Sequence, residues 1–155
     1  MITVDLVIPA VVASSKKQLL RVIAETCAVP FGIVADHLTT ALLEREKIGT
    51  TGIGDGVAVP HIKIKGLARI QTVLARLDHP VDYDAIDQKP VDIVFMILAP
   101  AESKTTQHLK MLAQASRFLK DAKFRQIIRE NREAEVLETL VQQWSAEQDV
   151  RESLA

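Results

Sequence analysis

The chain has 155 residues, of which 48% are hydrophobic and 25% are charged, a balance typical of a globular domain. This composition excludes intrinsic disorder and collagen-like structure. With 19 basic and 20 acidic side chains the net charge is -1, so the charge balance indicates neither a nucleic acid nor an anionic membrane as a partner. We therefore expect a local site to carry the function.

The cysteine content and the N-terminus both bear on the cellular compartment. The single cysteine, Cys27, cannot form an internal disulfide, which fits a reducing environment. Residues 1–5 lack the basic start and the small-residue cleavage site of a signal peptide. The longest apolar run, residues 93–101, covers about half of the length that a membrane-spanning helix needs. We expect a cytoplasmic protein without membrane insertion.

Two helices are predicted in the first third of the chain. Ser15 and Gln18 have the spacing of a capping box, and the apolar face that follows predicts a helix over residues 15–28. Pro30, whose fixed φ suits a first helical position, predicts the start of a second helix. Gly49 is predicted to end that second helix.

An arginine continues the apolar stripe of the second helix. Arg45 lies seven residues after Leu38 and three after Leu42, so it points where the helix otherwise buries apolar surface. A guanidinium at this position either belongs to a site or simply complements the helix C-terminus.

A glycine-rich segment follows. Residues 50–56 read Thr-Thr-Gly-Ile-Gly-Asp-Gly, which is too flexible for a helix or an ordinary strand and predicts a shaped loop. The loop leads into residues 57–62, a short strand in which Pro60 cannot donate to a ladder. His61 is therefore expected where a strand is interrupted.

The rest of the chain alternates strands and helices. Strands are predicted over residues 71–77 and 91–98, with a third suggested at 81–83, and the 91–98 strand is apolar enough to be covered on both faces. Ser103 to Thr106 offer N-caps for a helix that ends near Leu119 and carries His108 in its first turn. A short helix around residues 124–128 and a longer one from Asn131 to Trp144 complete the pattern.

No internal repeat and no linker divides the sequence. We therefore predict a single α/β domain over residues 1–145, with a mixed central β-sheet flanked by helices on both faces. The polar tail, residues 146–155, is expected to fray.

Several kinds of chemistry find little support. The acids are scattered over predicted helix surfaces, and the cluster of Asp82, Asp84 and Asp87 is more typical of turns than of paired catalytic carboxylates. No two histidines have the spacing of metal ligands, and neither a Walker A motif nor a dinucleotide-binding fingerprint is present. The sequence therefore calls for no metal and no cofactor.

The remaining pattern suits an oxyanion. Backbone amides of the loop around Gly52 and Gly54 can form a concave nest for phosphate oxygens, and Thr50 and Thr51 can add hydroxyl donors. Arg45 supplies charge and a planar donor fork. A ring nitrogen of His61 can then attack phosphorus, because imidazole is partly neutral near pH 7.

His108 adds a second imidazole whose position at a helix N-terminus should keep it neutral and able to donate to a phosphate oxygen. The residues alone leave plainer interpretations open. His61 can be an inconsequential strand-end residue, His108 a packing or capping residue, and the glycines only a turn.

The order of these residues resembles a known family. Arg45-Glu46, followed by the thirteen positions from Gly49 to His61, is similar to the active-site signature of enzyme IIA proteins of the bacterial sugar phosphotransferase system, of the fructose, mannitol and nitrogen-regulatory type. His108 and residues 90–92 fit the same family, so the resemblance covers most of the chain.

The resemblance implies both an activity and a partner. His61 would accept a phosphoryl group on Nε2 from a phosphohistidine of the carrier HPr or of its nitrogen-branch homologue. His108 and Arg45 would flank that phosphate, and no cofactor would take part.

Two positions depart from the family pattern. Ile62 stands where glycine or alanine often follows the active histidine, and a β-branched residue there can crowd an approaching carrier. Asp55 stands where asparagine is frequent, and its charge would oppose the phosphate if it pointed inward.

Three functions remain in competition. We favour a regulatory enzyme IIA of the nitrogen branch, because the chain is a lone domain and its residues 84–92 resemble that branch. The second is a transport enzyme IIA that passes phosphate to a fructose or mannitol IIB domain. The third is a binding module that contacts a partner without being phosphorylated.

Overall fold

The computed structural model describes residues 2–154, apart from the side chains of residues 105, 148 and 152. Strands and helices alternate along the chain. In order, they are β1 (Leu6–Val11), α1 (Lys16–Phe31), α2 (Ala35–Ile48), β2 (Gly52–Gly54), β3 (Val57–Ala58), β4 (His61–Ile64), β5 (Gln71–Val81), β6 (Val91–Pro100), α3 (Thr105–Leu119), α4 (Ala122–Glu130) and α5 (Ala134–Leu154).

The strands form one mixed sheet in the order β1-β5-β6-β3-β2, with β4 also pairing to β6. β5 and β6 run antiparallel, whereas β1 is parallel to β5 and both β3 and β4 are parallel to β6. β3 and β4 thus follow the same edge of β6, separated by Val59 and Pro60. The predicted interruption of the strand at Pro60 is confirmed.

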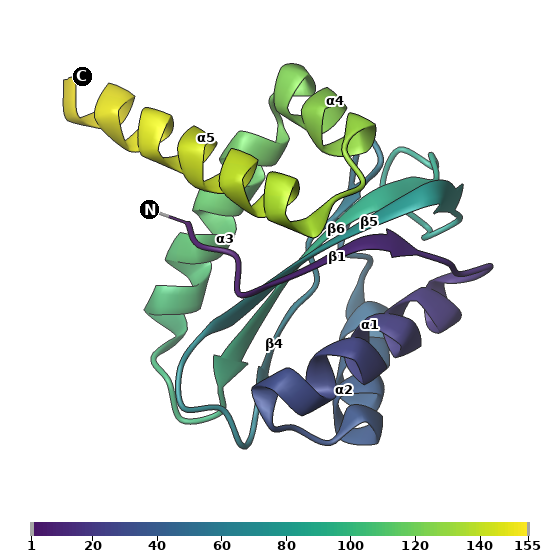
Figure 1. Ribbon diagram of the computed structural model, residues 1–155. Coiled ribbons are helices and arrows are strands. Elements are labelled where there is room, and N and C mark those ends of the chain that lie inside the picture. The colour runs from purple at the N-terminus through teal and green to yellow at the C-terminus, as the bar shows by residue number, and fades with distance from the viewer. Residues whose placement is uncertain (1, 155) are drawn as a thin grey trace.

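Helices cover both faces of the sheet (Figure 1), as predicted. α1 and α2 pack on one face, where Val94, Met96 and Leu98 of β6 point. α3, α4 and α5 pack on the other, where Ile93, Phe95 and Ile97 point. Alternate residues of β6 therefore serve two separate cores, which explains why this strand is apolar throughout.

The first two helices correct one prediction and confirm two. Ser15 caps α1 by accepting a hydrogen bond from the Gln18 amide, and Gly49 follows the last residue of α2, both as predicted. Pro30, however, lies inside α1 and does not begin α2. The end of α1 is set by Gly32, whose φ of 66° is a left-handed conformation that glycine adopts at little cost.

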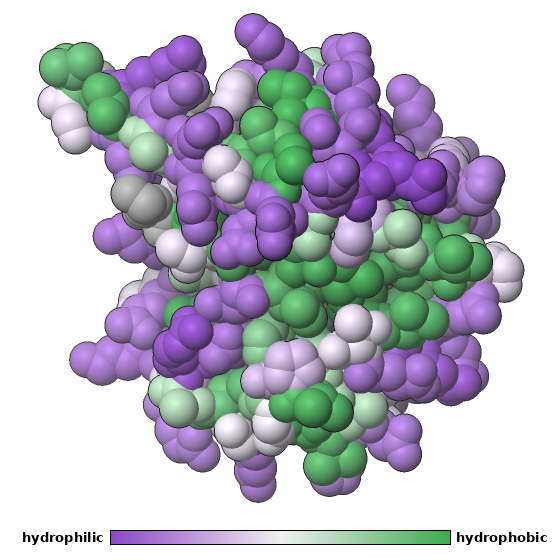
Figure 2. All heavy atoms as spheres, viewed as in Figure 1, coloured by the Kyte–Doolittle hydropathy of each residue, from purple (hydrophilic) through white to green (hydrophobic). Residues whose placement is uncertain are grey.

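The sheet holds two strands that the sequence analysis did not predict. β1 forms one edge, and its Pro9 suits an edge because proline cannot donate to a further strand. Figure 2 shows hydrophobic residues gathered across the middle of this side of the molecule, where β1 runs between the two helix layers. β2 lies within the segment predicted to be a loop, because pairing with β3 holds Gly52–Gly54 extended.

Three further expectations need revision. Val81 belongs to β5, so residues 81–83 form no separate strand. The N-cap of α3 is Lys104, which makes no side-chain cap bond, while the Ser103 hydroxyl donates to the carbonyl of Pro100. α5 continues as a helix to Leu154, through the tail that was expected to fray.

Candidate functional site

His61 is the first residue of β4 and is half-buried. Its Nδ1 lies 2.9 Å from the carbonyl oxygen of Val59. A carbonyl oxygen can only accept, so this contact assigns the proton of the neutral ring to Nδ1. Nε2 then carries the lone pair. The backbone two residues before His61 thus selects which nitrogen can act as the nucleophile.

The side chains of His61 and Ile62 in β4 point to opposite faces of the sheet. Ile62 packs against the core beneath α1 and α2. Because successive residues of a strand point to opposite faces, His61 points to the face that carries α3. Ile62 therefore points to the opposite face from the imidazole, and its effect on an approaching carrier stays a prediction.

His108 lies in the first turn of α3, as predicted, and is half-buried. Its Nδ1 is buried and has no hydrogen-bond partner among the described residues. Burial lowers the pKa of His108 below its ordinary value of 6.5, and electrostatic interactions with Lys63 and His61 lower it further. The expected direction of the shift is confirmed, but burial is the main cause.

Arg45 lies in the last turn of α2 and donates from Nη1 to the carbonyl of Gly49 at 2.8 Å. The segment after Gly49 runs antiparallel to the residues before His61. The Val59 amide donates to the Thr51 carbonyl at 2.9 Å, and Gly52 pairs with Ala58. The same register, continued by two residues, would set Gly49 opposite His61. Arg45 is thus bonded to the start of the segment that pairs with the residues before His61.

Most donors of the loop are directed at other protein groups. The amide and the hydroxyl of Thr51 both donate to Glu46. The Gly52 amide donates to the hydroxyl of Thr50, which in turn lies 3.4 Å from the Tyr83 carbonyl. The backbone amide of Thr50 has no hydrogen-bond partner among the described residues.

The structure does not bring Gly54 to His61. Positive φ values of 57° at Asp55 and 80° at Gly56 form a tight hairpin turn between β2 and β3. Along β6, Val57 pairs with Ile93 and His61 with Ile97, so the turn lies about 13 Å further along the strand at roughly 3.3 Å per residue. The sequence predicts that the whole loop forms one nest, but pairing with β3 places its second half far from His61.

The hairpin turn is anchored to α4. Arg129 donates to the carbonyl of Asp55 at 2.6 Å and forms a two-pronged pair with Asp92. The Asp55 carboxylate lies 3.9 Å from Arg125, and the Asp55 amide donates to Asp87. The charge of Asp55 therefore faces the arginines of α4 and not the imidazole. Sequence reasoning missed these arginines because only the tertiary structure brings α4 to the turn.

Among residues 2–154, no helix is long and apolar enough to cross a bilayer. Within the same range, His, Cys, Asp and Glu form no group of three that could hold a metal ion.

The structure is thus an α/β domain with a mixed sheet, and its strand β4 begins with an imidazole whose Nδ1 is bonded to the Val59 carbonyl, which leaves the lone pair on Nε2. The family model for the EIIA type 2 domain of the phosphoenolpyruvate-dependent sugar phosphotransferase system matches residues 1–143, and the chain belongs to this family.

Relatives and solved structures agree with this assignment. The chain is 41% identical over 133 residues to a nitrogen regulatory protein of Bradyrhizobium diazoefficiens, covering 86% of each chain. It is 42% identical over 84 residues, 54% of each chain, to a fructose-specific EIIA component of Haloferax volcanii. The structure of nitrogen regulatory protein IIA-Ntr from Neisseria meningitidis superposes with a TM-score of 0.79 at 29% identity, covering 87% of this chain and 91% of that one. The predicted fold and family are confirmed.

Proposed function

We propose that this chain is a cytoplasmic phosphocarrier of the nitrogen branch of the phosphotransferase system, phosphorylated on Nε2 of His61. The donor is a phosphohistidine of HPr or of its nitrogen-branch homologue. The observation that carries the proposal is the 2.9 Å contact between His61 Nδ1 and the Val59 carbonyl, since it leaves Nε2 as the nucleophile.

The transfer needs little beyond positioning and charge. The Nε2 lone pair attacks phosphorus while the bond from phosphorus to the donor's ring nitrogen breaks, and that nitrogen keeps the bonding pair. The His61 ring gains positive charge as the new bond forms, which strengthens its donation from Nδ1 to Val59. This carbonyl therefore stabilises the product ring as well as orienting it.

The surroundings of Nε2 supply donors for the phosphoryl oxygens. Arg45, His108 and the Thr50 amide are the groups we assign to this role, because negative charge spreads over the equatorial oxygens during in-line transfer. Thr51 and Gly52 support the loop through the bonds described above, and Gly54 shapes the hairpin. His108 is kept neutral by its lowered pKa and can donate without holding the phosphate permanently.

A regulatory role follows from similarity and charge. The relative that matches 86% of the chain is a nitrogen regulatory protein. Phosphorylation adds about -1.5 to -2 charges at one place on a chain whose net charge is -1. Such a change alters which protein surfaces the chain attracts, so the phosphorylation state can act as a switch.

The test is to incubate the protein with phosphoenolpyruvate, enzyme I and either carrier, and to measure acid-labile phosphoryl label. The wild type should label and His61→Ala should not. Equal labelling of the two proteins would contradict the proposal. Absence of label in the wild type with both carriers would favour a binding module that is not phosphorylated.

The similarity to a fructose-specific EIIA component favours one alternative, in which the chain passes phosphate to a sugar-transport IIB domain. Labelled protein mixed with a fructose or mannitol IIB domain distinguishes the two roles. A regulatory protein should keep its label, whereas rapid transfer to the IIB domain would establish transport.

A further inference from the structure

Glu46 is a buried carboxylate directly after Arg45 in the last turn of α2, and its side chain is only 5% exposed. It accepts hydrogen bonds from the Thr51 amide at 3.0 Å and from the Thr51 hydroxyl at 2.5 Å. A buried charge is costly unless it is paired and hydrogen-bonded, so these bonds strongly constrain where residue 51 can lie.

The protons in this cluster can be assigned. A carboxylate only accepts, so the Thr51 hydroxyl donates to Glu46. The hydroxyl of Tyr83, 3.0 Å from Thr51 Oγ1, must then donate to Thr51. Tyr83 is fully buried, and both this burial and the Glu46 charge raise its pKa, so it stays protonated.

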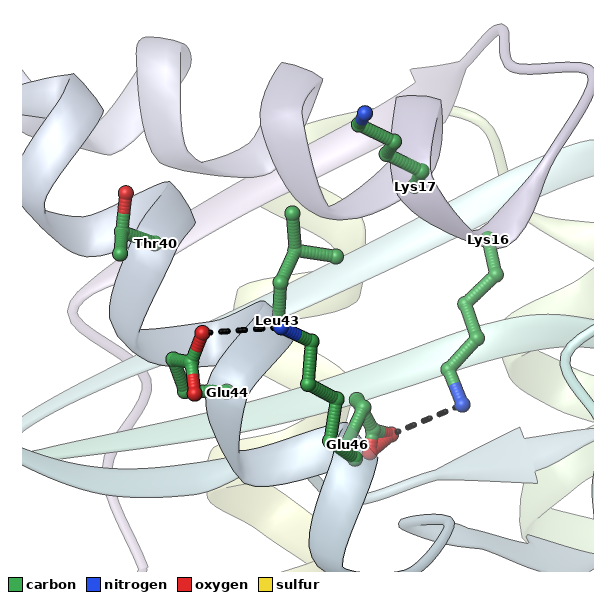
Figure 3. Close-up of a pocket in the computed structure, with 7 residues that line it drawn as sticks. Lys16, Lys17, Thr40, Leu43, Glu44 and Glu46 are labelled. Carbon is green, nitrogen blue, oxygen red and sulfur yellow. Dashed lines mark hydrogen bonds and ion pairs between the residues drawn. The ribbon is translucent and has the colours of Figure 1, made fainter.

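Lys16 at the start of α1 compensates the carboxylate. Its Nζ lies 3.6 Å from Glu46 and 4.5 Å from the centre of the Tyr83 ring. Figure 3 shows Lys16 reaching toward Glu46 across a pocket between α1 and α2. The cluster therefore ties three separate segments, namely the start of α1, the end of α2 and the loop at Thr51.

Two hydrogen bonds connect this cluster to the imidazole. The Thr51 carbonyl accepts from the Val59 amide at 2.9 Å, and the Val59 carbonyl accepts from His61 Nδ1 at 2.9 Å. The amide of Val59 is thus bonded to Thr51, which Glu46 fixes. The carbonyl of Val59 in turn orients the imidazole of His61.

We propose that Glu46 is a positioning residue for phosphoryl transfer, acting through Thr51 and Val59 on the orientation and tautomer of His61. The proposal deepens the function proposed above and rests on it. The expected effect of removing Glu46 on the transfer rate follows from geometry, because a displacement of about 1 Å in a reacting group can slow a reaction by up to about 100-fold.

The experiment compares variants of Glu46 with a matched control on the same helix. Glu46→Ala should lower the rate of phosphoryl transfer to His61 by about 10-fold or more, measured on folded protein below its unfolding temperature. Glu46→Gln keeps an oxygen that accepts from Thr51 and should stay within about 3-fold of wild type. Glu44→Gln is the control, since Glu44 is exposed and pairs only with Lys47 among the described residues.

A second measurement separates positioning from stability. In ¹⁵N NMR spectra of the unphosphorylated protein near pH 8, wild-type His61 should show a protonated Nδ1, and Glu46→Ala should show a mixture of tautomers. If Glu46→Ala does not fold, Thr51→Val serves instead, because it removes the hydroxyl that donates to Glu46 and should shift the tautomers in the same direction.

The outcomes distinguish this inference from the function on which it rests. A folded Glu46→Ala protein with wild-type transfer and unchanged tautomers would overturn the positioning role while leaving His61 phosphorylation intact. Equal slowing of Glu46→Ala and Glu46→Gln would also overturn it, because the accepting oxygen would then be irrelevant. A wild type that takes no label would refute the proposed function, whereas the tautomer measurement would still decide the effect of Glu46.

Discussion

The two halves of the glycine-rich segment, residues 49–52 and 53–56, have different surroundings. The first half contacts the residues before His61: the Gly49 carbonyl accepts from Arg45, and the Thr51 carbonyl accepts from the Val59 amide. The second half turns near the start of β6, where Arg129 and Asp87 bind the backbone of Asp55. A continuous motif in the sequence is therefore divided in space, because its first half pairs with Val59 and its second half is bound by Arg129 of α4.

This difference explains which donors can serve a phosphate. A glycine-rich run predicts a nest only if its amides converge, whereas pairing with β3 extends residues 52–54. The residues that we propose to bind the phosphoryl group come from separate elements, with Arg45 in α2, Thr50 in the loop after it and His108 in α3. We expect substitutions of residues that contact the first half to affect activity, and substitutions of residues that contact the second half to affect stability.

The largest effect is expected for Arg45, which contacts the first half of the segment at Gly49. Arg45→Met should slow phosphoryl transfer by about 100-fold, because it removes a charged donor from the developing negative charge. The free energy of unfolding should change by less than about 0.5 kcal/mol, since the lost contact to the Gly49 carbonyl is a single surface bond. Rapid-quench labelling and urea unfolding measure the two quantities, with the exposed Arg21→Met as a control.

Arg129, which contacts the second half of the segment at Asp55, should affect stability and not activity. Arg129→Met should lower the free energy of unfolding by about 2 kcal/mol, because it leaves the half-buried Asp92 unpaired and frees the Asp55 carbonyl. Transfer by the folded protein should stay within about 2-fold of wild type. A variant that is stable but slow would show that the turn belongs to the site after all.

His108 predicts a dependence of stability on pH. Its pKa is below 6.5 in the folded protein, so between that value and 6.5 the unfolded chain binds more protons. Stability should therefore fall as the pH decreases through this window and level off below it. When urea unfolding is measured at pH 7.5 and at pH 5.5, His108→Gln should lose less unfolding free energy between the two pH values than wild type. Equal losses would contradict a lowered pKa of His108 in the folded protein.

The smallest effect is expected at Asp55. Asp55→Asn should change the unfolding free energy by less than about 0.5 kcal/mol, because asparagine tolerates the left-handed conformation and the contact to Arg125 is long. Transfer should change by less than 2-fold, since the carboxylate faces α4. A large rate increase in the labelling assay would mean that this charge does oppose the phosphate.

Local signals in the sequence predicted local structure well. Ser15, Gly49 and the apolar 91–98 segment act through neighbouring residues, and the helix start, the helix end and the doubly covered strand are confirmed. Asp82 and Asp87 likewise accept hydrogen bonds from amides two residues later, as expected for turns. Pro30 was misinterpreted because it lies inside α1 near its C-terminal end, and Gly32 supplies the actual end of the helix.

The parts that escaped prediction depend on contacts between distant segments. β1 is held by β5, more than sixty residues away, and β2 exists only through its pairing with β3. His61, Arg45 and His108 were predicted as a group from their chemistry and from the family resemblance. Glu46 belongs to the motif that carries the family resemblance, but its proposed positioning role could not be predicted, because that role arises from contacts with Thr51 and Lys16.

The most direct test of the central claim is to identify the phosphorylated nitrogen. Protein labelled with ¹⁵N in its histidines, phosphorylated by enzyme I and a carrier, should show phosphorus coupled to Nε2 of residue 61 in NMR spectra. A phosphoryl group on Nδ1 of that ring, or on any other histidine, would contradict the account.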